Sequence, residues 1–301
     1  MKKLLITGSN GFVGSYFVEN YKDKYEIKAF SFRDDDIATL ECGGLDVVLH
    51  LSALVHQMRG ASAEEYERIN VTQTLALAKK AKGIGVSHFV FMSTVKVYGE
   101  ETDGVYTESS PCHPEDEYGK SKLKAENELL KLEDDNFRVS ILRTPIVYGF
   151  GVKANIRSLV DLVKKVPILP FGGIENRRSM VYVGNLCYLV DAIIRLPVKL
   201  GMKEGVFLAC DDEPLSTTRL CKLMADELGK VMYLVKVPCF KTFLRLVKPS
   251  FYKRLYGSLE VDNTLTMQKL FGISSQIGNN EYKMPYSVEE GINLMIKGES
   301  I

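Results

Sequence analysis

Three side chains in this sequence have the types and spacing of a hydride-transfer site. They are Thr94, Tyr118 and Lys122, and they lie downstream of a glycine-rich turn. Tyr118 and Lys122 are four residues apart, so a helix over 118–132 would place both on one face. A phenol titrates near ~10 in water, and a neighbouring ammonium lowers its pKa. Tyr118 would exchange a proton with the oxygen of a substrate hydroxyl or ketone, whose carbon exchanges hydride with a nicotinamide, and Thr94 would hold that oxygen.

The glycine-rich turn has the spacing of a dinucleotide site. Gly8, Gly11 and Gly14 join a predicted strand at 3–7 to a predicted helix at 12–21. Gly8 permits the tight turn, Gly11 lets the backbone approach a pyrophosphate, and Gly14 allows close packing of the helix on the strand. The start of that helix would face the phosphates. Because a Tyr-x-x-x-Lys pair alone is common, this context is what favours the hydride-transfer interpretation.

Short apolar runs that alternate with helical segments must position these residues. We expect strands at 4–7, 27–30, 46–51, 88–92, 139–142 and 206–209, and helices at 63–81, 118–132 and 185–196. The alternation predicts an α/β protein with a doubly wound parallel sheet. Ligands bind beyond the carboxyl ends of strands in such sheets, and the glycine turn, Ser93 with Thr94, and Pro145 all fall there.

The sequence pattern changes after residue 150, where proline and glycine residues separate shorter segments. This change predicts a smaller C-terminal substrate lobe interleaved with the first. We expect residues 1–150 plus about 179–210 to form the dinucleotide-binding lobe, and residues 151–178 plus about 211–301 to form the substrate-binding lobe.

Composition argues against several classes of function. The 39 basic and 38 acidic residues nearly cancel, so we expect no nucleic-acid partner. The six cysteines show no Cys-x-x-Cys spacing and the four histidines no ligand spacing, so we expect no metal site and no disulfide framework. The apolar run near the N-terminus is too short for a signal peptide or a membrane span, and we expect a cytoplasmic protein.

One segment, 238–249, has apolar residues at helical spacing with a basic opposite face. Such a helix either lies on a membrane surface or caps the substrate lobe with its lysines in solvent. We favour the capping helix and expect no peripheral membrane contact.

Seven motifs in order resemble the extended short-chain dehydrogenase/reductases, specifically the NAD(P)-dependent nucleotide-sugar epimerase/dehydratase group, whose fold is the Rossmann fold. The motifs lie at 7–14, 46–53, 70–71, 91–99, 118–122, 143–149 and 178–186. The resemblance implies that Thr94, Tyr118 and Lys122 are catalytic and that Thr94 and Tyr118 also contact the substrate. The residues expected at the cofactor are Gly8, Gly11, Phe12, Val13, Gly14, Asp36, Ile37, Leu51, Ala53, Ser93, Tyr118, Lys122 and Pro145.

The same resemblance assigns residues to a nucleotide-sugar substrate. Asn155 and Arg178 match positions that hold the nucleotide diphosphate, for which an arginine fork is suited. His56 follows a strand end close to where the sugar should lie, so it is a further candidate substrate contact.

Two departures from the family pattern narrow the chemistry. Sugar 4,6-dehydratases carry an acidic pair after the catalytic threonine, whereas this chain has Val95 and Lys96, which cannot serve as acid and base in that elimination. NAD-preferring members place an aspartate after the second strand, whereas this chain has Ser31 with Arg33 two residues later. This pair suits a ribose 2′-phosphate, so we favour NADP(H), while Asp34, Asp35 and Asp36 keep NAD(H) open.

The motifs are most similar to the subgroup that reduces the C4 ketone of UDP-4-keto-6-deoxy-N-acetylhexosamines in surface-polysaccharide synthesis. UDP-hexose or UDP-N-acetylhexosamine 4-epimerases share the catalytic residues and are the alternative function, and a non-catalytic dinucleotide-binding sensor is a second alternative. The resemblance also implies a homodimer through the helices at 63–81 and 118–132, with Leu75 and Leu129 as candidate contacts.

Overall fold

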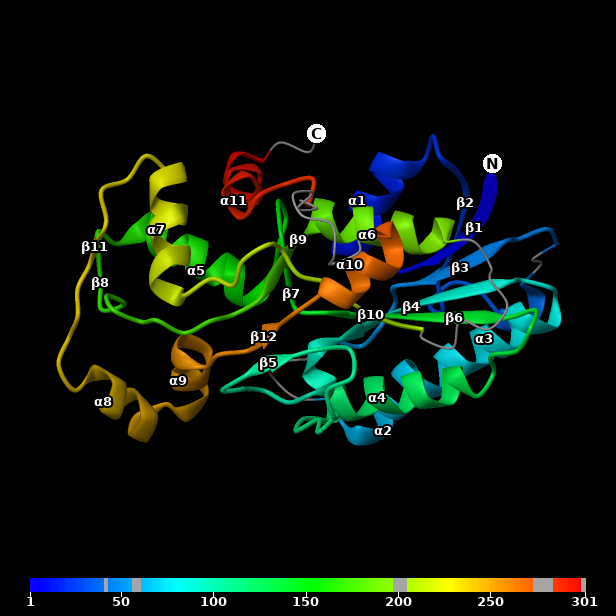
Figure 1. The fold of residues 1–301 in the computed structure, drawn as a ribbon, viewed down its shortest axis with the longest axis horizontal. Helices are drawn as coiled ribbons and strands as arrows, with labels where there is room; N and C mark the ends of the chain where they lie inside the picture. Colours follow the sequence, from blue (N-terminus) through cyan, green and yellow to red (C-terminus); the bar gives the residue numbers. More distant parts are fainter. Residues whose placement is uncertain (41–42, 56–60, 197–204, 273–283, 299–301) are drawn as a thin grey trace.

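The computed structural model describes residues 1–40, 43–55, 61–196, 205–272 and 284–298. Its centre is a parallel sheet of six strands in the order β10-β6-β4-β3-β1-β2 (Figure 1). The strands are β1 (Lys2–Thr7), β2 (Tyr25–Phe30), β3 (Val47–His50), β4 (His88–Thr94), β6 (Arg138–Thr144) and β10 (Val206–Leu208). The predicted doubly wound α/β fold is confirmed.

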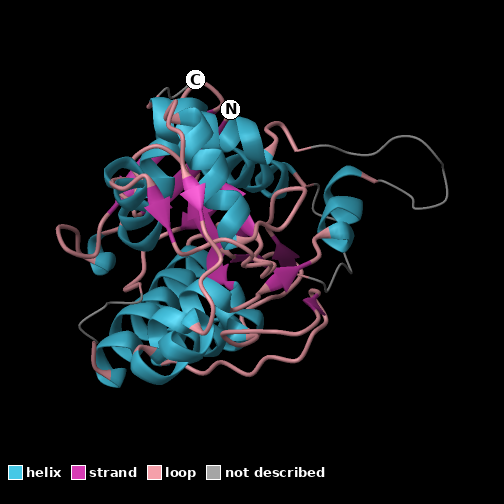
Figure 2. Cartoon of the chain, turned by 90° about the vertical axis from the view of Figure 1, so that its left-hand side faces the viewer, coloured by secondary structure: helices cyan, strands magenta, loops and turns pink. Residues whose placement is uncertain are grey.

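The sheet is covered by helices on both faces, as Figures 1 and 2 show. Helices α1 (Phe12–Tyr21) and α6 (Val183–Arg195) pack on one face, and α3 (Thr74–Gly83) and α4 (Glu117–Leu130) pack on the other. Alternate residues of each strand therefore enter two different cores. Leu4 and Ile6 of β1 belong to the first core, and Leu5 belongs to the second. Burial on both faces explains why the strands read as continuous apolar runs.

The order of the strands places a switch point at β1. The chain runs from β1 to β2 on one side and continues with β3 on the other side of β1. Crevices at such points, beyond the carboxyl ends of the strands, are where open α/β sheets bind ligands. The glycine turn follows β1 directly, so its position in the sheet agrees with its predicted role.

The helix expected at 63–81 is present but not uniform. It consists of α2 (Ala63–Tyr66), a π-helical segment η2 (Glu67–Gln73) and α3. Leu129 of α4, expected at a dimer contact, is completely buried against the sheet. That expectation is wrong because helical periodicity cannot distinguish an inward-facing stripe from an outward-facing one.

Three short parallel strand pairs lie outside the main sheet. They are β7 (Ile146–Tyr148) with β9 (Met180–Tyr182), β8 (Ile168–Leu169) with β11 (Tyr233–Leu234), and β5 (Val105–Tyr106) with β12 (Glu260–Val261). The remaining helical elements are η1 (Ile37–Thr39), η3 (Val95–Val97), α5 (Ala154–Lys165), α7 (Thr217–Glu227), α8 (Phe240–Val247), α9 (Pro249–Tyr256), α10 (Thr264–Phe271) and α11 (Val288–Lys297).

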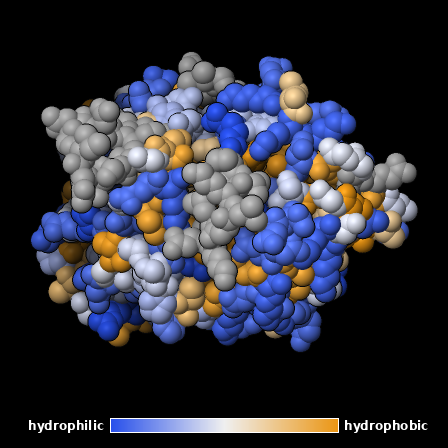
Figure 3. Space-filling model, turned by 45° about the vertical axis from the view of Figure 1, so that its right-hand side comes forward, coloured by the Kyte–Doolittle hydropathy of each residue, from blue (hydrophilic) through white to orange (hydrophobic). Residues whose placement is uncertain are grey.

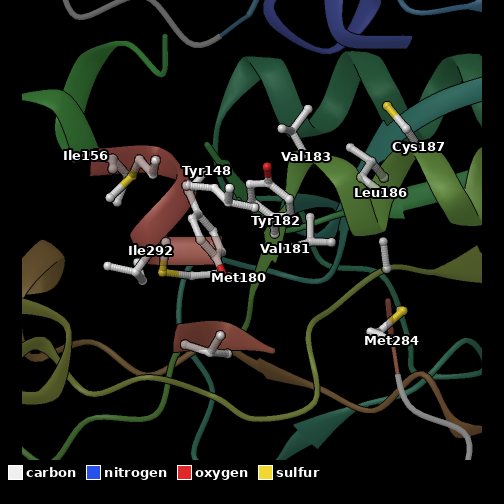
Figure 4. Close-up of a cluster of buried hydrophobic side chains, with 14 of the residues drawn as sticks. Tyr148, Ile156, Met180, Val181, Tyr182, Val183, Leu186, Cys187, Met284 and Ile292 are labelled. Carbon is white, nitrogen blue, oxygen red and sulfur yellow. The ribbon is translucent and has the colours of Figure 1, made fainter. Parts of the chain in front are cut away.

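A continuous core joins these elements to the main sheet. Tyr148, Tyr182 and Met180 of the β7–β9 pair pack with Ile292 of α11 and with α6, as Figure 4 shows. The face shown in Figure 3 is largely hydrophilic, with apolar side chains scattered over it. The lobe boundaries expected from the sequence stay a prediction.

No helix among the described residues is both long and apolar enough to span a bilayer.

Candidate active site

The β1–α1 turn has the close backbone contacts that its glycines require. Gly8 has a positive φ of 71°, and a Cβ on it would lie 3.0 Å from the Ser52 nitrogen. A Cβ on Gly14 would lie 2.1 Å from the Gly8 carbonyl oxygen, so no side chain fits there. Gly11 is the N-cap of α1 and provides no side-chain cap. The first turn of α1, with Phe12 and Val13, therefore fits the diphosphate of a dinucleotide.

Beside this turn, His50 of β3 links β1 and α3 through its side chain. Its ring nitrogens hydrogen-bond the hydroxyls of Thr7 at 2.7 Å and Thr74 at 2.9 Å. Burial, and then Lys122, lowers the pKa of His50 to about 3, so the imidazole is neutral. Leu51 and Ala53 follow directly after β3, beside the glycine turn. Within the described ranges, no three His, Cys, Asp or Glu side chains are grouped to hold a metal ion.

Thr94 and Tyr118 come together where β4 ends and α4 begins. Thr94 is the last residue of β4, and Asp116 caps α4 by accepting a hydrogen bond from the Gly119 nitrogen at 2.7 Å. The Thr94 side chain is close enough to the Tyr118 phenol to lower its pKa. Lys122, one turn further along α4, is 1% exposed, and its Nζ lies 3.8 Å from the centre of the Phe91 ring.

Burial changes the acidity of both catalytic candidates. It raises the pKa of Tyr118, Asp116 and Tyr66 raise it further, and Thr94 lowers it. It lowers the pKa of Lys122 to about 7, against the opposing effect of Glu126. The expectation that Lys122 depresses the pKa of Tyr118 is therefore not met in the protein alone, where burial has the largest effect and raises that pKa.

A buried polar network behind these residues was missed from the sequence. Glu126 forms an ion pair with Arg143, with 2.6 Å between Oε2 and Nη2, and accepts a hydrogen bond from the Ser93 hydroxyl. Arg143 also donates to the Tyr98 hydroxyl at 2.8 Å. The available signal was a glutamate one turn after Lys122 on the buried face of the helix. Since the Ser93 hydroxyl donates to Glu126, it keeps only acceptor capacity for a cofactor.

Asn70 links the loop after β3 to the catalytic helix. Its side chain accepts from the Leu54 nitrogen at 2.8 Å and donates to the Leu54 carbonyl and the Ser121 hydroxyl, each at 3.0 Å. Asn70 lies in the π-helical segment and is 1% exposed. Asn70 therefore holds the part of α4 that carries Lys122 in place against the loop after β3.

The loop after β2 is built on Ser31. The Ser31 hydroxyl donates to Asp34 at 2.8 Å, and its backbone nitrogen donates to Asp35 at 2.7 Å. Asp36 caps the short helix η1, in which Ile37 is the first residue. Arg33 is exposed and forms no ion pair with any side chain in the described part of the chain.

Away from the Thr94–Tyr118 site, a cavity of about 250 Å³ lies between α5, α7 and α9. Asn155, Arg178, Asn176 and Arg254 supply polar groups, and the rest of the wall is mainly aliphatic. Arg178 Nη2 donates to the carbonyl oxygens of Lys253 at 3.2 Å and Gly257 at 2.9 Å, whereas its buried Nε has no partner among described atoms. Pro145 lies between β6 and β7. His56 lies outside the described residues.

The parallel sheet, the glycine turn at its switch point and the Thr-Tyr-Lys group together define a nicotinamide-dinucleotide enzyme of the short-chain dehydrogenase/reductase class. The chain belongs to the NAD dependent epimerase/dehydratase family, which matches residues 4–206. The family agrees with the one that the seven sequence motifs led us to expect.

The chain is similar in sequence to a 4-epimerase, and similar in fold to both epimerases and a reductase. The chain is 36% identical to a UDP-glucose 4-epimerase of Vibrio cholerae over 96% of this chain and 93% of that protein. It is similar in fold to a UDP-glucuronic acid 4-epimerase from Bacillus cereus in complex with NAD, with a TM-score of 0.74, 20% identity and coverage of 98% and 95%. It is also similar to a dTDP-4-dehydrorhamnose reductase from Bacillus anthracis in complex with NADP, with a TM-score of 0.75, 20% identity and full coverage of both chains (100% and 100%).

Proposed function

We propose that this enzyme reduces the C4 ketone of a UDP-4-keto-6-deoxy-N-acetylhexosamine with NADPH. The observation that carries the proposal is the placement of Thr94 at the end of β4, of Tyr118 in the first turn of α4, and of the buried Lys122 one turn further along that helix. Two hydroxyls that converge on one point can bind one ketone oxygen, which is the geometry that carbonyl reduction needs.

The protonation states of the site support reduction. NADPH, when bound, supplies the hydride that adds to the ketone carbon. The Tyr118 phenol gives its proton to the ketone oxygen, which completes the conversion of C=O to CH–OH, and Thr94 orients that oxygen. Burial keeps the Tyr118 phenol protonated in the protein alone, and its acidity must increase when cofactor and substrate bind for it to donate this proton.

The residues after Thr94 support reduction over dehydration. Val95 is buried, and the Lys96 ammonium is held by Glu100 at 2.6 Å and Asp116 at 2.7 Å. These partners raise the pKa of Lys96 although burial opposes them. A charged, paired lysine cannot abstract the proton that a sugar 4,6-dehydration must remove.

Arg178 supports a nucleotide-diphosphate substrate. Its guanidinium is held by two carbonyl oxygens, and no carboxylate in the described residues forms an ion pair with it. Burial lowers the pKa of this half-buried guanidinium, while Glu101 and Glu100 nearby raise it. A guanidinium without a direct ion pair can bind an anionic ligand, and the aliphatic cavity beside it suits the nucleoside. Arg178 and Asn155 are our candidates for binding the UDP moiety. The proposed ligands, a UDP-sugar and NADPH, are soluble metabolites, which agrees with the cytoplasmic placement expected from the sequence.

The preference for NADPH rests on Arg33. Its exposed guanidinium lies three residues beyond the end of β2, where it is available to a ribose 2′-phosphate.

A 4-epimerase is the second candidate. The 36% identity with the Vibrio cholerae UDP-glucose 4-epimerase favours it, and so do Asp34 and Asp35, whose carboxylates gather at Ser31 and suit a ribose diol. An epimerase returns the hydride to the same sugar and must retain oxidised NAD, whereas a reductase exchanges its cofactor at every turnover.

The test compares the two reactions on one preparation of the protein. We expect NADPH consumption, followed by absorbance, when a UDP-4-keto-6-deoxy-N-acetylhexosamine is added, and no stoichiometric NAD released on denaturation. Interconversion of UDP-glucose and UDP-galactose without added cofactor, by protein that carries bound NAD, would replace the reductase by the epimerase.

We also propose a homodimer that pairs through the outer faces of α3 and α4. Leu75 is partly buried and remains a candidate contact, while the exposed part of this face includes an ion pair between Lys124 and Glu67 at 2.6 Å. Light scattering at micromolar concentration should give the mass of two chains, and a monomeric mass would end this proposal.

A further inference from the structure

We propose that α8 and the chain that flanks it form a docking surface for an anionic lipid bilayer. This inference does not depend on the proposed reaction.

The apolar side of α8 faces solvent. Phe243 is 57% exposed, Leu246 77% and Val247 56%, whereas Leu244 alone in α8 is buried in the core. The basic residues of this helix are in solvent, as expected for a capping helix, but most of its apolar side chains are exposed as well. Leu244 and the partly buried Phe240 pack against the core, and these contacts leave the other apolar side chains of this two-turn helix uncovered.

Exposed apolar residues continue on both sides of α8. Val235 and Val237 precede it and are 40% and 43% exposed, and Phe251 of α9 is 38% exposed. Neighbouring large apolar groups in this density are uncommon on the surface of a soluble monomer and mark an interaction site.

The charge of this segment is strongly one-sided. Residues 228–259 contain seven basic residues and no acidic residue, while the whole chain has a net charge of +1. The remaining 269 residues therefore carry −6. The seven basic residues are Lys230, Lys236, Lys241, Arg245, Lys248, Lys253 and Arg254.

The cations of α8 itself remain available to a partner. Arg245 and Lys248 are exposed and form no ion pair with the described side chains, and Lys241 lies 5.7 Å from the Tyr256 ring centre. Exposed apolar side chains beside unpaired Lys and Arg are the pattern of helices that lie in a membrane interface.

A bilayer explains this surface better than a second copy of the chain. A symmetric contact would place the same patch on both subunits, so fourteen positive charges would gather without a carboxylate from either segment. Anionic headgroups instead complement the cations while the apolar side chains enter the acyl boundary.

The position of α8 permits such contact. Figure 1 shows α8 at the end of the long axis of the molecule, distant from the six-stranded sheet. Helix α9 packs beside α8 and contributes Phe251 and Arg254 to the 250 Å³ cavity. Docking through α8 would therefore hold that cavity close to the membrane surface.

The test is sedimentation of the full chain with vesicles of phosphatidylcholine alone or mixed with phosphatidylglycerol. We expect binding only to the mixed vesicles, and weaker binding as salt rises. The double variant Phe243→Ser/Leu246→Ser should bind the mixed vesicles at least about tenfold more weakly than the wild type. Arg245→Gln/Lys248→Gln should show a similar loss. The matched control Val105→Ser/Leu265→Ser removes two exposed apolar side chains elsewhere and should bind like the wild type.

Circular dichroism and turnover of a soluble substrate should be unchanged in all three variants, which separates a binding defect from unfolding. The proposal is overturned if the wild type does not sediment with mixed vesicles, binds phosphatidylcholine equally well, or loses binding in the control variant. It is also overturned if the α8 variants bind vesicles normally but change the mass of the protein in solution, because the surface would then belong to another protein chain.

Discussion

The Glu126 carboxylate and the Arg143 guanidinium form a buried ion pair, with 2.6 Å between Oε2 and Nη2, behind the strand end that carries Thr94. Burial alone would lower the pKa of Arg143, but its hydrogen bonds to Glu126 raise it above the ordinary value. Arg143 lies beside Ser93 in the register of β6 and β4, and Ser93 donates to the same carboxylate. The pair therefore fixes α4, which carries Tyr118 and Lys122, against the two central strands.

Breaking this pair should destabilise the protein more than removing it. Glu126→Gln leaves a buried guanidinium without its countercharge, and we expect a loss of about 3–5 kcal/mol in the free energy of unfolding. Glu126→Gln/Arg143→Met removes both charges and should lose less than the sum of the single variants. Urea unfolding measures all three, and strictly additive losses would show that the two residues are not coupled.

Tyr118→Phe tests the proton donor. The substitution keeps the ring but removes the hydroxyl that donates the proton, so turnover should fall on the order of 100-fold or more while dinucleotide affinity changes little. Steady-state kinetics and a cofactor titration provide the two readouts. Wild-type turnover in this variant would refute the assignment.

Lys122→Met should change how stability depends on pH. Lys122 has a pKa of about 7 in the folded protein against an ordinary 10.5, so the unfolded chain binds more protons between these values. Its unfavourable contribution is complete below about pH 7 and disappears as the pH rises toward 10.5. Relative to the wild type, the variant should therefore gain melting temperature near neutral pH, and the gain should shrink at alkaline pH.

The same variant should lose activity and cofactor affinity, because the family resemblance places Lys122 at the nicotinamide ribose. A melting-temperature difference that does not vary with pH would contradict the buried, depressed ammonium.

Arg178→Ala tests the substrate cavity. The Michaelis constant for the UDP-sugar should rise at least about tenfold, since a charged hydrogen bond is worth ~1.5–3 kcal/mol, and dinucleotide affinity should stay unchanged. Arg177→Ala is the matched control, because Arg177 is exposed and pairs with Glu260 at 2.5 Å. Equal effects of the two variants, or weakening of both ligands, would place Arg178 outside the substrate site.

Arg33→Ala tests cofactor choice. Loss of one charge-assisted contact to a 2′-phosphate should lower the preference for NADPH over NADH by about tenfold. The ratio of kcat/KM for the two cofactors provides the measurement. An unchanged ratio would show that Arg33 does not determine the cofactor preference. It would favour NAD, bound through the carboxylates of Asp34 and Asp35.

The sequence by itself determined the elements and their order. The strand before the glycine turn and the helix over 12–21 were predicted closely, because turn glycines, apolar strands and helical spacing act over a few residues. Thr94 was expected beyond a strand end, and the family resemblance grouped it with Tyr118, which lies in the first turn of α4.

Only the tertiary structure decided which faces are covered and which polar groups meet. Glu126 finds Arg143 and Ser93 through the register of β4 with β6 and the seat of α4 on them, which no local pattern encodes. Leu129 and Leu246 both occupy apolar positions of helices, yet Leu129 is 0% and Leu246 77% exposed. Periodicity defines an apolar stripe on a helix, but the packing of distant elements determines whether that stripe is buried.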